Sequence, residues 1–330
     1  MTSDTTIAGV PGSDADEPLV EGWSGAPVGR VGDRVFLGLS RGAGVAILVT
    51  LASVTAFLVW QAVPALIAPS NEVGPGGNEG NGKGFLAYVG TLVFGTVWAA
   101  LLALLIAVPF GVAVALYISH YAPRRLARSL GYVIDLLAAI PSVVYGLWGI
   151  FVLAPLVADN VYPWFNDRLG FVPFFSGDVL ASGRSMATIG IVLAVMILPI
   201  ITAISREVFL QTPRLNEEAA LALGATRWEM IRVAVLPYGK SGVISGAMLG
   251  LGRALGETMA VALILAPANV YSFQLFTSQN PNTIAANIAL QFPESTGLEV
   301  NTLVATGLVL FVITLVVNVM SRRIARRRVA

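Results

Sequence analysis

The chain has 330 residues, of which 56% are hydrophobic and only 12% charged, and its mean hydropathy is +0.78. Soluble domains carry about 25% charged residues, so much of this apolar surface is expected to face lipid. A net charge of +1 argues against a nucleic-acid-binding protein. The absence of cysteine and the presence of one histidine, His120, exclude disulfides, Cys-ligated metals and His-based catalytic triads.

The first segment, residues 1–40, is polar and contains an acidic cluster at Asp14, Asp16, Glu17 and Glu21. A secretory signal would begin with basic residues followed at once by a short apolar core, which this segment lacks. Its low hydrophobicity predicts a disordered cytoplasmic tail.

Six stretches further along the chain are long and apolar enough to cross a bilayer, which takes about 20 residues. We therefore predict an all-α integral membrane protein whose six-helix domain covers residues 41–321, followed by a basic cytoplasmic tail at 322–330. Proline interrupts three of the stretches, which a packed helix bundle tolerates. The predicted spans are Gly42–Ile67, Phe85–Ile118, Val133–Val157, Met186–Ile204, Val243–Ala266 and Thr302–Met320.

Lysine and arginine are distributed unequally between the two sets of connections. Sixteen lie in the N-terminal tail, the second and fourth connections and the C-terminal tail, whereas three (Lys83, Arg168 and Arg184) lie in the other connections. Positively charged loops stay in the cytoplasm. This distribution predicts that both termini and residues 205–241 are cytoplasmic.

The long cytoplasmic connection, about residues 205–240, contains Glu218-Ala219-Ala220, then Gly224, then Leu236-Pro237. Small alanines allow close helix packing, and glycine permits a turn with positive φ. Pro237 stands where the next span begins. An ordinary amphipathic helix is the alternative interpretation of this segment.

The spacing of these residues resembles the EAA loop of ABC importer permeases, with Ala234 standing where that pattern usually has isoleucine. Segments such as Glu218–Arg232, Gly250–Val261 and Thr283–Ala289 are similar to PstC-type permeases of phosphate importers. The resemblance covers nearly everything from Thr91 to Ser321.

This resemblance implies a type I ABC importer permease fold and a loop that docks in a groove of a cytoplasmic ATPase. The implied partners are a homologous PstA-like permease, a PstB-like ATPase dimer and a PstS-like extracytoplasmic phosphate-binding protein. ATP and Mg²⁺ would be used by the ATPase, and no cofactor or metal is expected on this chain.

Two charged residues fall within the fifth predicted span. Arg253 lies about 18 Å beyond the cytoplasmic end of that span, near the middle of the bilayer. Glu257 follows at i+4, which places the two on one face of a continuous helix. Ionisable groups at this depth typically mark transport pathways, so we predict that both line the substrate path. A self-neutralising structural ion pair is the alternative. Glycines 242, 246 and 250, with 252 and 256, predict a close helix-packing seam.

Other features have simpler interpretations. Residues 77–83 fit G-x-x-x-x-G-K, but Gly84 replaces the Ser or Thr that a P-loop needs for Mg²⁺. We expect His120 to be an interfacial residue and Asp135 a satisfied carboxylate at a span boundary. Tyr162, Trp164 and Phe165 read as interfacial anchors.

Three rival functions remain. The same machine could carry another oxyanion or small solute. A secondary transporter predicts repeated broken helices in two halves and no EAA loop. A membrane-embedded enzyme lacks a candidate nucleophile–base pair or metal cluster in this sequence.

Overall fold

The computed structural model describes residues 31–69, 84–268 and 270–326. The acidic segment and the G-x-x-x-x-G-K segment at 77–83 therefore lie outside the described residues. Helix α1 (Val31–Ile67) begins earlier than expected: residues 31–40, assigned to the tail, are helical. Asp33 in its first turn interacts favourably with the N-terminal end of the helix dipole. The chain consists of two compact units, and the boundary between them falls within α1: the first ends at Val54 and the second starts at Thr55.

Five helices of the described residues are long and apolar enough to cross a membrane, whereas the sequence predicted six spans. The protein is thus a multi-pass, helical membrane protein. The predicted span without a counterpart among these five is the fifth, Val243–Ala266. The five stretches are Gly32–Ile67, Gly84–Tyr121, Ser142–Leu169, Met186–Leu210 and Leu298–Ser321.

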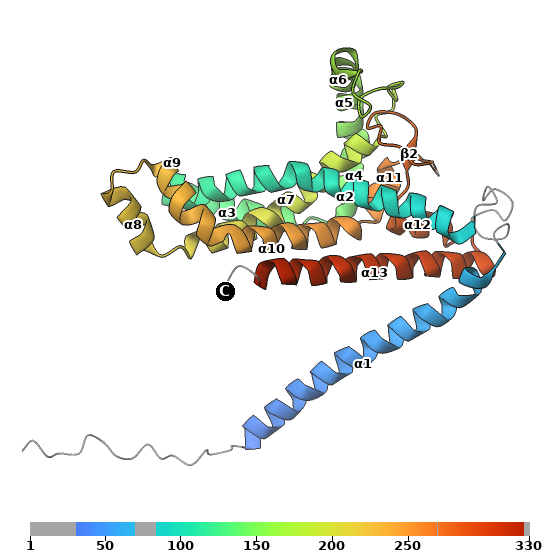
Figure 1. Ribbon diagram of the computed structural model, residues 1–330, viewed down its shortest axis with the longest axis horizontal. Coiled ribbons are helices and arrows are strands. Elements are labelled where there is room, and N and C mark those ends of the chain that lie inside the picture. The colour runs from blue at the N-terminus through green and yellow to red at the C-terminus, as the bar shows by residue number, and fades with distance from the viewer. Residues whose placement is uncertain (1–30, 70–83, 269, 327–330) are drawn as a thin grey trace, which may run out of the picture. The chain divides into compact units, whose positions relative to one another are not determined.

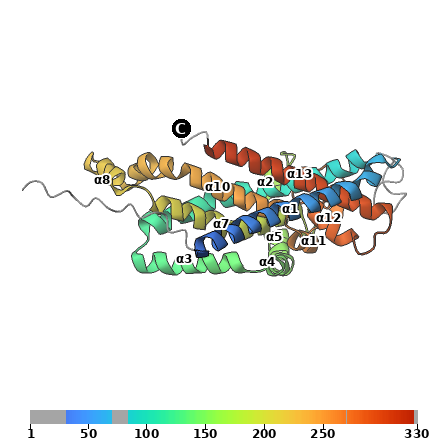
Figure 2. The same ribbon diagram turned by 90° about the horizontal axis from the view of Figure 1, so that it is seen from below.

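The centre of the second unit is a bundle in which four long helices run side by side (Figures 1 and 2). These are α2 (Gly84–Leu116), α7 (Met186–Leu210), α10 (Leu236–Leu255) and α13 (Leu298–Arg326). Buried small residues recur on α2, and the buried isoleucines and leucines of α7 pack against them. In lipid, such small residues let helix backbones approach closely. The main ones are Ala99, Ala103, Ala107, Gly111 and Ala115.

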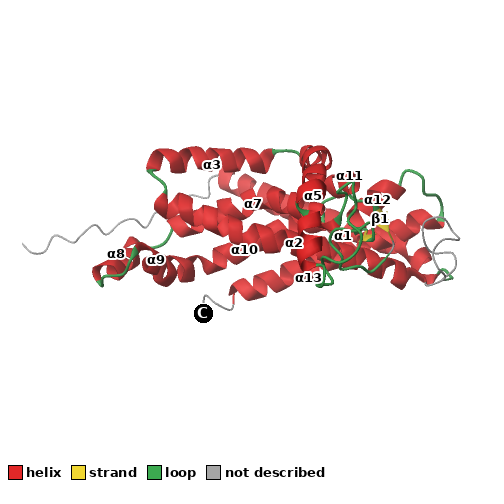
Figure 3. Cartoon of the chain, turned by 90° about the horizontal axis from the view of Figure 1, so that it is seen from above, coloured by secondary structure: helices red, strands yellow, loops and turns green. Residues whose placement is uncertain are grey.

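The third predicted span, Val133–Val157, is wrong in its first half. Helix α3 (Arg124–Ala139) ends before Pro141, and Ile140 is extended, with φ −65° and ψ 131°. A residue that precedes proline is driven out of the helical region, which accounts for the break. The chain then continues as α4 (Ser142–Trp148), the π-helical turn η2 (Gly149–Leu153) and α5 (Ala154–Asn160). α3 lies beside α7 instead of forming part of that span (Figure 3).

Away from α8, the bundle carries α12 (Ile284–Gln291) and a two-residue parallel ladder, and α6 (Tyr162–Leu169) projects from its side (Figure 1). The ladder pairs β1 (Pro267–Ala268) with β2 (Asn280–Pro281). Tyr162, expected at the membrane interface, is instead buried and stacks on Phe276 at 4.3 Å between ring centroids. Trp164 is half exposed, and the guanidinium of Arg168 lies over its ring, with Cζ 5.2 Å from the ring centroid. At the C-terminus α13 continues to Arg326, so residues 322–326 of the expected tail are helical.

Candidate functional site

The connection between α7 and α10 folds as a short helix-turn-helix. Helix α8 (Arg214–Ala222) is followed by α9 (Arg227–Met230) and the π-helical turn η3 (Ile231–Val235). α9, η3 and α10 form one uninterrupted helical stretch from Arg227 to Leu255, with Pro237 in the first turn of α10. At 1.5 Å per residue this stretch is about 43 Å long. The loop is therefore rigidly joined to the membrane helix that carries Arg253.

Gly224 makes the turn after α8. Its φ is +86°, and a Cβ added there would meet nothing within 4 Å, so conformation alone requires glycine. The N–H of Gly224 donates to the carbonyl of Leu221 at 3.0 Å, and that of Ala225 donates to the carbonyl of Ala220 at 3.2 Å. These two bonds are the pair that closes a helix C-terminus in a Schellman motif. The second alanine of the Glu-Ala-Ala triplet thus accepts one of them.

The second helix of the loop starts with a capping box. Glu229 donates its backbone N–H to the hydroxyl of Thr226 at 3.3 Å, and its carboxylate accepts from the backbone N–H and hydroxyl of Thr226, both at 2.8 Å. These hydrogen bonds, the backbone one foremost, lower the pKa of the Glu229 carboxyl. Schellman motif and capping box together fix the two helices on either side of Gly224.

The loop presents one face to the bundle and leaves the other open. Ala220 packs against a buried cluster that includes Phe209, Met230 and Ile231. A further tie is the ion pair between Nε2 of His120 and Oε1 of Glu217, 3.4 Å apart. Glu218 and Ala219 are exposed on the other face. The same connection also exposes large apolar side chains, which is typical of a docking surface: Leu215, Leu223, Trp228 and Val233.

α10 packs against α7 through its glycines. A Cβ at Gly242 would collide with Val208, and Gly246 and Gly250 lie against Ile204 and Ile201. The predicted glycine seam is confirmed here within the bundle. Gly252 is different, because it is exposed and a Cβ there would meet nothing within 4 Å. α10 therefore has one face closed by α7 and another that stays open.

The predicted fifth span is interrupted, which corrects the expected relation between its two charges. α10 ends at Leu255, and α11 (Met259–Ile264) begins after a break at residues 256–258. Glu257 lies in the break, so it does not share a helix face with Arg253, and no ion pair joins them. Instead, buried Glu257 accepts a hydrogen bond from the N–H of Ala260 at 3.1 Å. Its carboxylate thereby satisfies a free donor at the start of α11.

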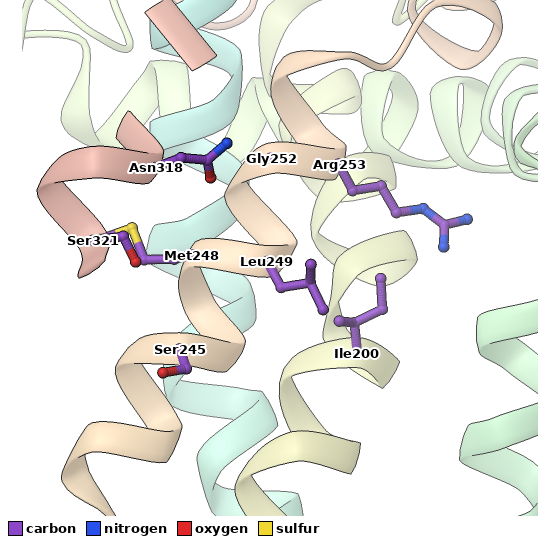
Figure 4. A pocket seen from close by; sticks show the side chains of 8 residues that line it. All are labelled: Ile200, Ser245, Met248, Leu249, Gly252, Arg253, Asn318 and Ser321. Carbon is purple, nitrogen blue, oxygen red and sulfur yellow. The ribbon is translucent and has the colours of Figure 1, made fainter. Parts of the chain in front are cut away.

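Arg253 borders a cavity of about 550 Å³ on the open face of α10. The cavity is bounded by Ile200 of α7 and by Asn318 and Ser321 of α13, and Figure 4 shows the Arg253 side chain extending away from these two polar residues. Arg253 makes one long hydrogen bond, 3.5 Å from Nη1 to the carbonyl of Ala138 at the end of α3. Its remaining donors have no partner among the described residues, so the guanidinium is available to an anion.

Sequence reasoning missed the role of Arg184, which it assigned to an outer connection. Arg184 donates to the carbonyls of Leu263, Ile264 and Leu265 at 3.1–3.4 Å. It thus satisfies the end of α11, where helix carbonyls lack intrahelical partners. Asn318 and Ser321 were also missed, because neither stands in a recognisable motif. Only the packing of α13 against α10 brings them to the cavity.

Comparisons with known proteins agree with this geometry. The family described as "Binding-protein-dependent transport system inner membrane component" matches residues 107–329. The phosphate transport system permease protein PstC 2 of Mycobacterium tuberculosis is 45% identical over 310 residues, which cover 91% of this chain and 94% of that protein. The phosphate transport system permease protein PstC of Xylella fastidiosa is 46% identical over 236 residues, covering 70% and 72%.

One solved structure supports the same fold. A bacterial ABC transporter involved in the import of the acidic polysaccharide alginate aligns with a TM-score of 0.56 at 18% identity, covering 89% of this chain and 96% of that chain.

Proposed function

The chain belongs to the family of binding-protein-dependent transport system inner membrane components, and we propose that it forms the path of inorganic phosphate through an ATP-driven importer. It is a membrane-spanning transport subunit, and the ATPase of such an importer is a separate chain. The observation that carries the substrate assignment is Arg253. This residue borders a cavity on the open face of a membrane helix, in a chain whose relatives are named phosphate transport permeases.

Four partners complete the proposed importer. A homologous permease faces the open side of α10, so that the path runs between the two permeases. Two ATPase copies bind ATP and Mg²⁺ on the cytoplasmic side, and this chain binds neither. An extracytoplasmic phosphate-binding protein delivers the anion. Both termini and the coupling loop are cytoplasmic in this proposal, which rests on the unequal distribution of arginine and lysine.

Arg253 is proposed to attract phosphate near the middle of the membrane. A guanidinium presents a planar set of donors that matches two phosphate oxygens at once. Its single long contact with Ala138 leaves most of those donors free. Because transport requires release as well as entry, the site must hold the anion weakly.

Glu257 is proposed to add selectivity from the break that follows α10, two residues after the end of the helix that carries Arg253. One oxygen accepts from Ala260, and the second accepts no hydrogen bond from the described residues. Phosphate near neutral pH keeps a proton that it can donate to this oxygen. Sulfate has no such proton and meets only repulsion, which disfavours the wrong anion.

The continuous helix from Arg227 to Leu255 is proposed to connect ATP use with transport. The exposed apolar face of α8 and α9 binds the ATPase, and closure of the two ATPases draws the coupling loops of both permeases together. A rigid helix passes this displacement to Arg253 and to the break at residues 256–258. Outward opening of the path follows, and hydrolysis reverses it.

Uptake of radiolabelled phosphate by the complete complex in liposomes tests the proposal. Arg253→Ala should lower uptake by about 10- to 100-fold, since hydrogen bonds to charged groups contribute about 1.5–3 kcal/mol. Arg125→Ala is the control, because Arg125 is an exposed arginine on α3 that does not line the cavity. Co-purification of all subunits establishes that the variants assemble. Normal uptake by an assembled Arg253→Ala complex would refute the assignment.

Glu257→Gln separates the two roles of the carboxylate. Glutamine keeps an oxygen that can accept from Ala260 but removes the charge. Sulfate uptake should rise relative to phosphate uptake in this variant, whereas Glu257→Ala should lose uptake of both anions. If the wild-type complex imports sulfate or another oxyanion in preference to phosphate, the family assignment stands and the substrate assignment is wrong.

A further inference from the structure

A second cavity, of about 580 Å³, lies at the end of the bundle that carries α8. It forms where the chain leaves α2 through the π-helical turn η1 (Tyr117–Tyr121), reverses into α3, and packs against α7. Four arginines line it, together with one carboxylate, Asp135. We refer to it as the arginine pocket, and its arginines are Arg124, Arg128, Arg206 and Arg214.

The positive charge of the arginine pocket is not neutralised within the described residues. Within the described residues, the side chains of its four arginines and of Asp135 form no ion pair and no hydrogen bond. Arg124 and Arg128 are spaced i, i+4 on α3, an arrangement in which like charges repel. Four cations against one anion leave an excess that only a bound anion or solvent can balance.

Arg206 shows that the pocket is more than a solvated basic surface. Its Nε is buried and has no hydrogen-bond partner among the described residues. The guanidinium lies against Gly131 of α3, where an added Cβ would come within 2.9 Å of Nη1. A buried donor left unsatisfied is costly, so the position of Arg206 fits a ligand that accepts from it.

We propose that the arginine pocket binds a phosphate group, separately from the transport path. Guanidinium groups bind phosphate oxygens in pairs, and four converging arginines suit a tetrahedral anion. Two sources share this chemistry: the headgroup of an anionic phospholipid and free phosphate. Basic pockets between membrane helices on the cytoplasmic side bind anionic headgroups. Exposed Tyr132, Val133 and Leu136 on α3 can contact acyl chains.

The position of Arg214 links the arginine pocket to helix α8. Arg214 is the first residue of α8, whereas the other three arginines belong to α3 and α7. A phosphate bound by all four therefore ties the coupling helix to the membrane bundle. Occupancy should stabilise the loop that we assign to ATPase coupling, although phosphate binding in the pocket does not depend on that assignment.

The test uses the complete complex in nanodiscs, with thermal unfolding as the measurement. One arm compares phosphatidylcholine discs with discs that also contain phosphatidylglycerol. The other adds inorganic phosphate to phosphatidylcholine discs. The variants are Arg128→Gln, which changes an exposed residue and spares the core, and Arg206→Gln. Arg125→Gln is the matched control, because Arg125 is exposed on the same helix but does not line the pocket.

Stabilisation of the wild type in at least one arm is expected. Each pocket variant should bind about fivefold more weakly, the equivalent of about 1 kcal/mol per arginine, and Arg125→Gln should bind as the wild type does. An effect confined to the first arm identifies the lipid headgroup, and one confined to the second identifies free phosphate. The proposal is overturned if neither arm stabilises the wild type, or if the pocket variants respond like Arg125→Gln.

Discussion

Replacing Gly224 by valine is the sharpest test of the coupling loop. Gly224 is exposed and has no neighbour within 4 Å of an added Cβ, so the substitution creates no clash. Its φ of +86° is nevertheless one that residues with a Cβ rarely adopt. The variant therefore changes the backbone preference of the turn without disturbing any packing.

The expected magnitude follows from that backbone strain. A left-handed conformation costs a non-glycine residue about 1–2 kcal/mol, and a β-branched side chain falls at the upper end. At 1.4 kcal/mol per factor of ten, the correctly turned loop becomes about 5- to 30-fold less favoured relative to alternative conformations. The Schellman hydrogen bonds from Gly224 and Ala225 are lost in those alternatives. α8 then no longer presents its exposed face at a fixed angle.

Co-purification of the ATPase and ATP-driven phosphate uptake measure the effect. Gly224→Val should insert normally but retain less ATPase and transport less, whereas Gly224→Asn should be milder because asparagine tolerates this conformation. Gly297→Val is the matched control: Gly297 also has positive φ, +55°, and open space, but lies just before α13, away from the loop. Normal uptake and ATPase retention in Gly224→Val, or equal losses in Gly297→Val, would refute the reasoning.

Three further predictions concern topology, packing and pH. Arg227 and Ser278 are both exposed, and this chain has no cysteine, so each can be replaced singly by cysteine. In intact cells an impermeant thiol reagent should label the cysteine at position 278 and not the one at 227; the reverse labelling pattern excludes the predicted orientation. Gly95→Ala should lower the free energy of unfolding by about 2 kcal/mol or more, because the Cβ of alanine would collide with the backbone carbonyl of Asn282. An unchanged thermal unfolding midpoint would contradict the close approach of Gly95 to Asn282. Because the hydrogen bonds from Thr226 hold the pKa of Glu229 below its usual value of 4.5, the stabilising contribution of this cap is fully present above pH 4.5 and is lost as the pH falls through the lowered pKa. Acidification below pH 4.5 should therefore raise amide exchange in α9; the same rise in Glu229→Gln would exclude this carboxylate as the cause.

The sequence by itself determined the class of protein and the turn in the loop between α7 and α10. Long apolar stretches are read directly as membrane helices because lipid leaves the backbone few alternatives. The permease resemblance that rested on Glu218-Ala219-Ala220 and Gly224 is confirmed by relatives 45% identical over most of the chain. The turn at Gly224 was predictable too, because glycine is the residue that most readily adopts a positive φ, and its position in the sequence therefore indicates such a turn.

Tertiary structure decided where the helices are interrupted. Hydropathy favoured an unbroken third span, yet Pro141 ends α3 and allows it to lie beside α7. The fifth span breaks after Leu255, and the short α11 that follows is satisfied at both ends by side chains. Glu257 caps its start locally, and Arg184, far away in sequence, satisfies the carbonyls at its end. Helical periodicity placed Arg253 and Glu257 on one face only under the assumption of a continuous helix. A polar contact between distant segments leaves no periodic signal in the sequence, so the separation of these two charges and the convergence of arginines from α3, α7 and α8 emerged only from the fold.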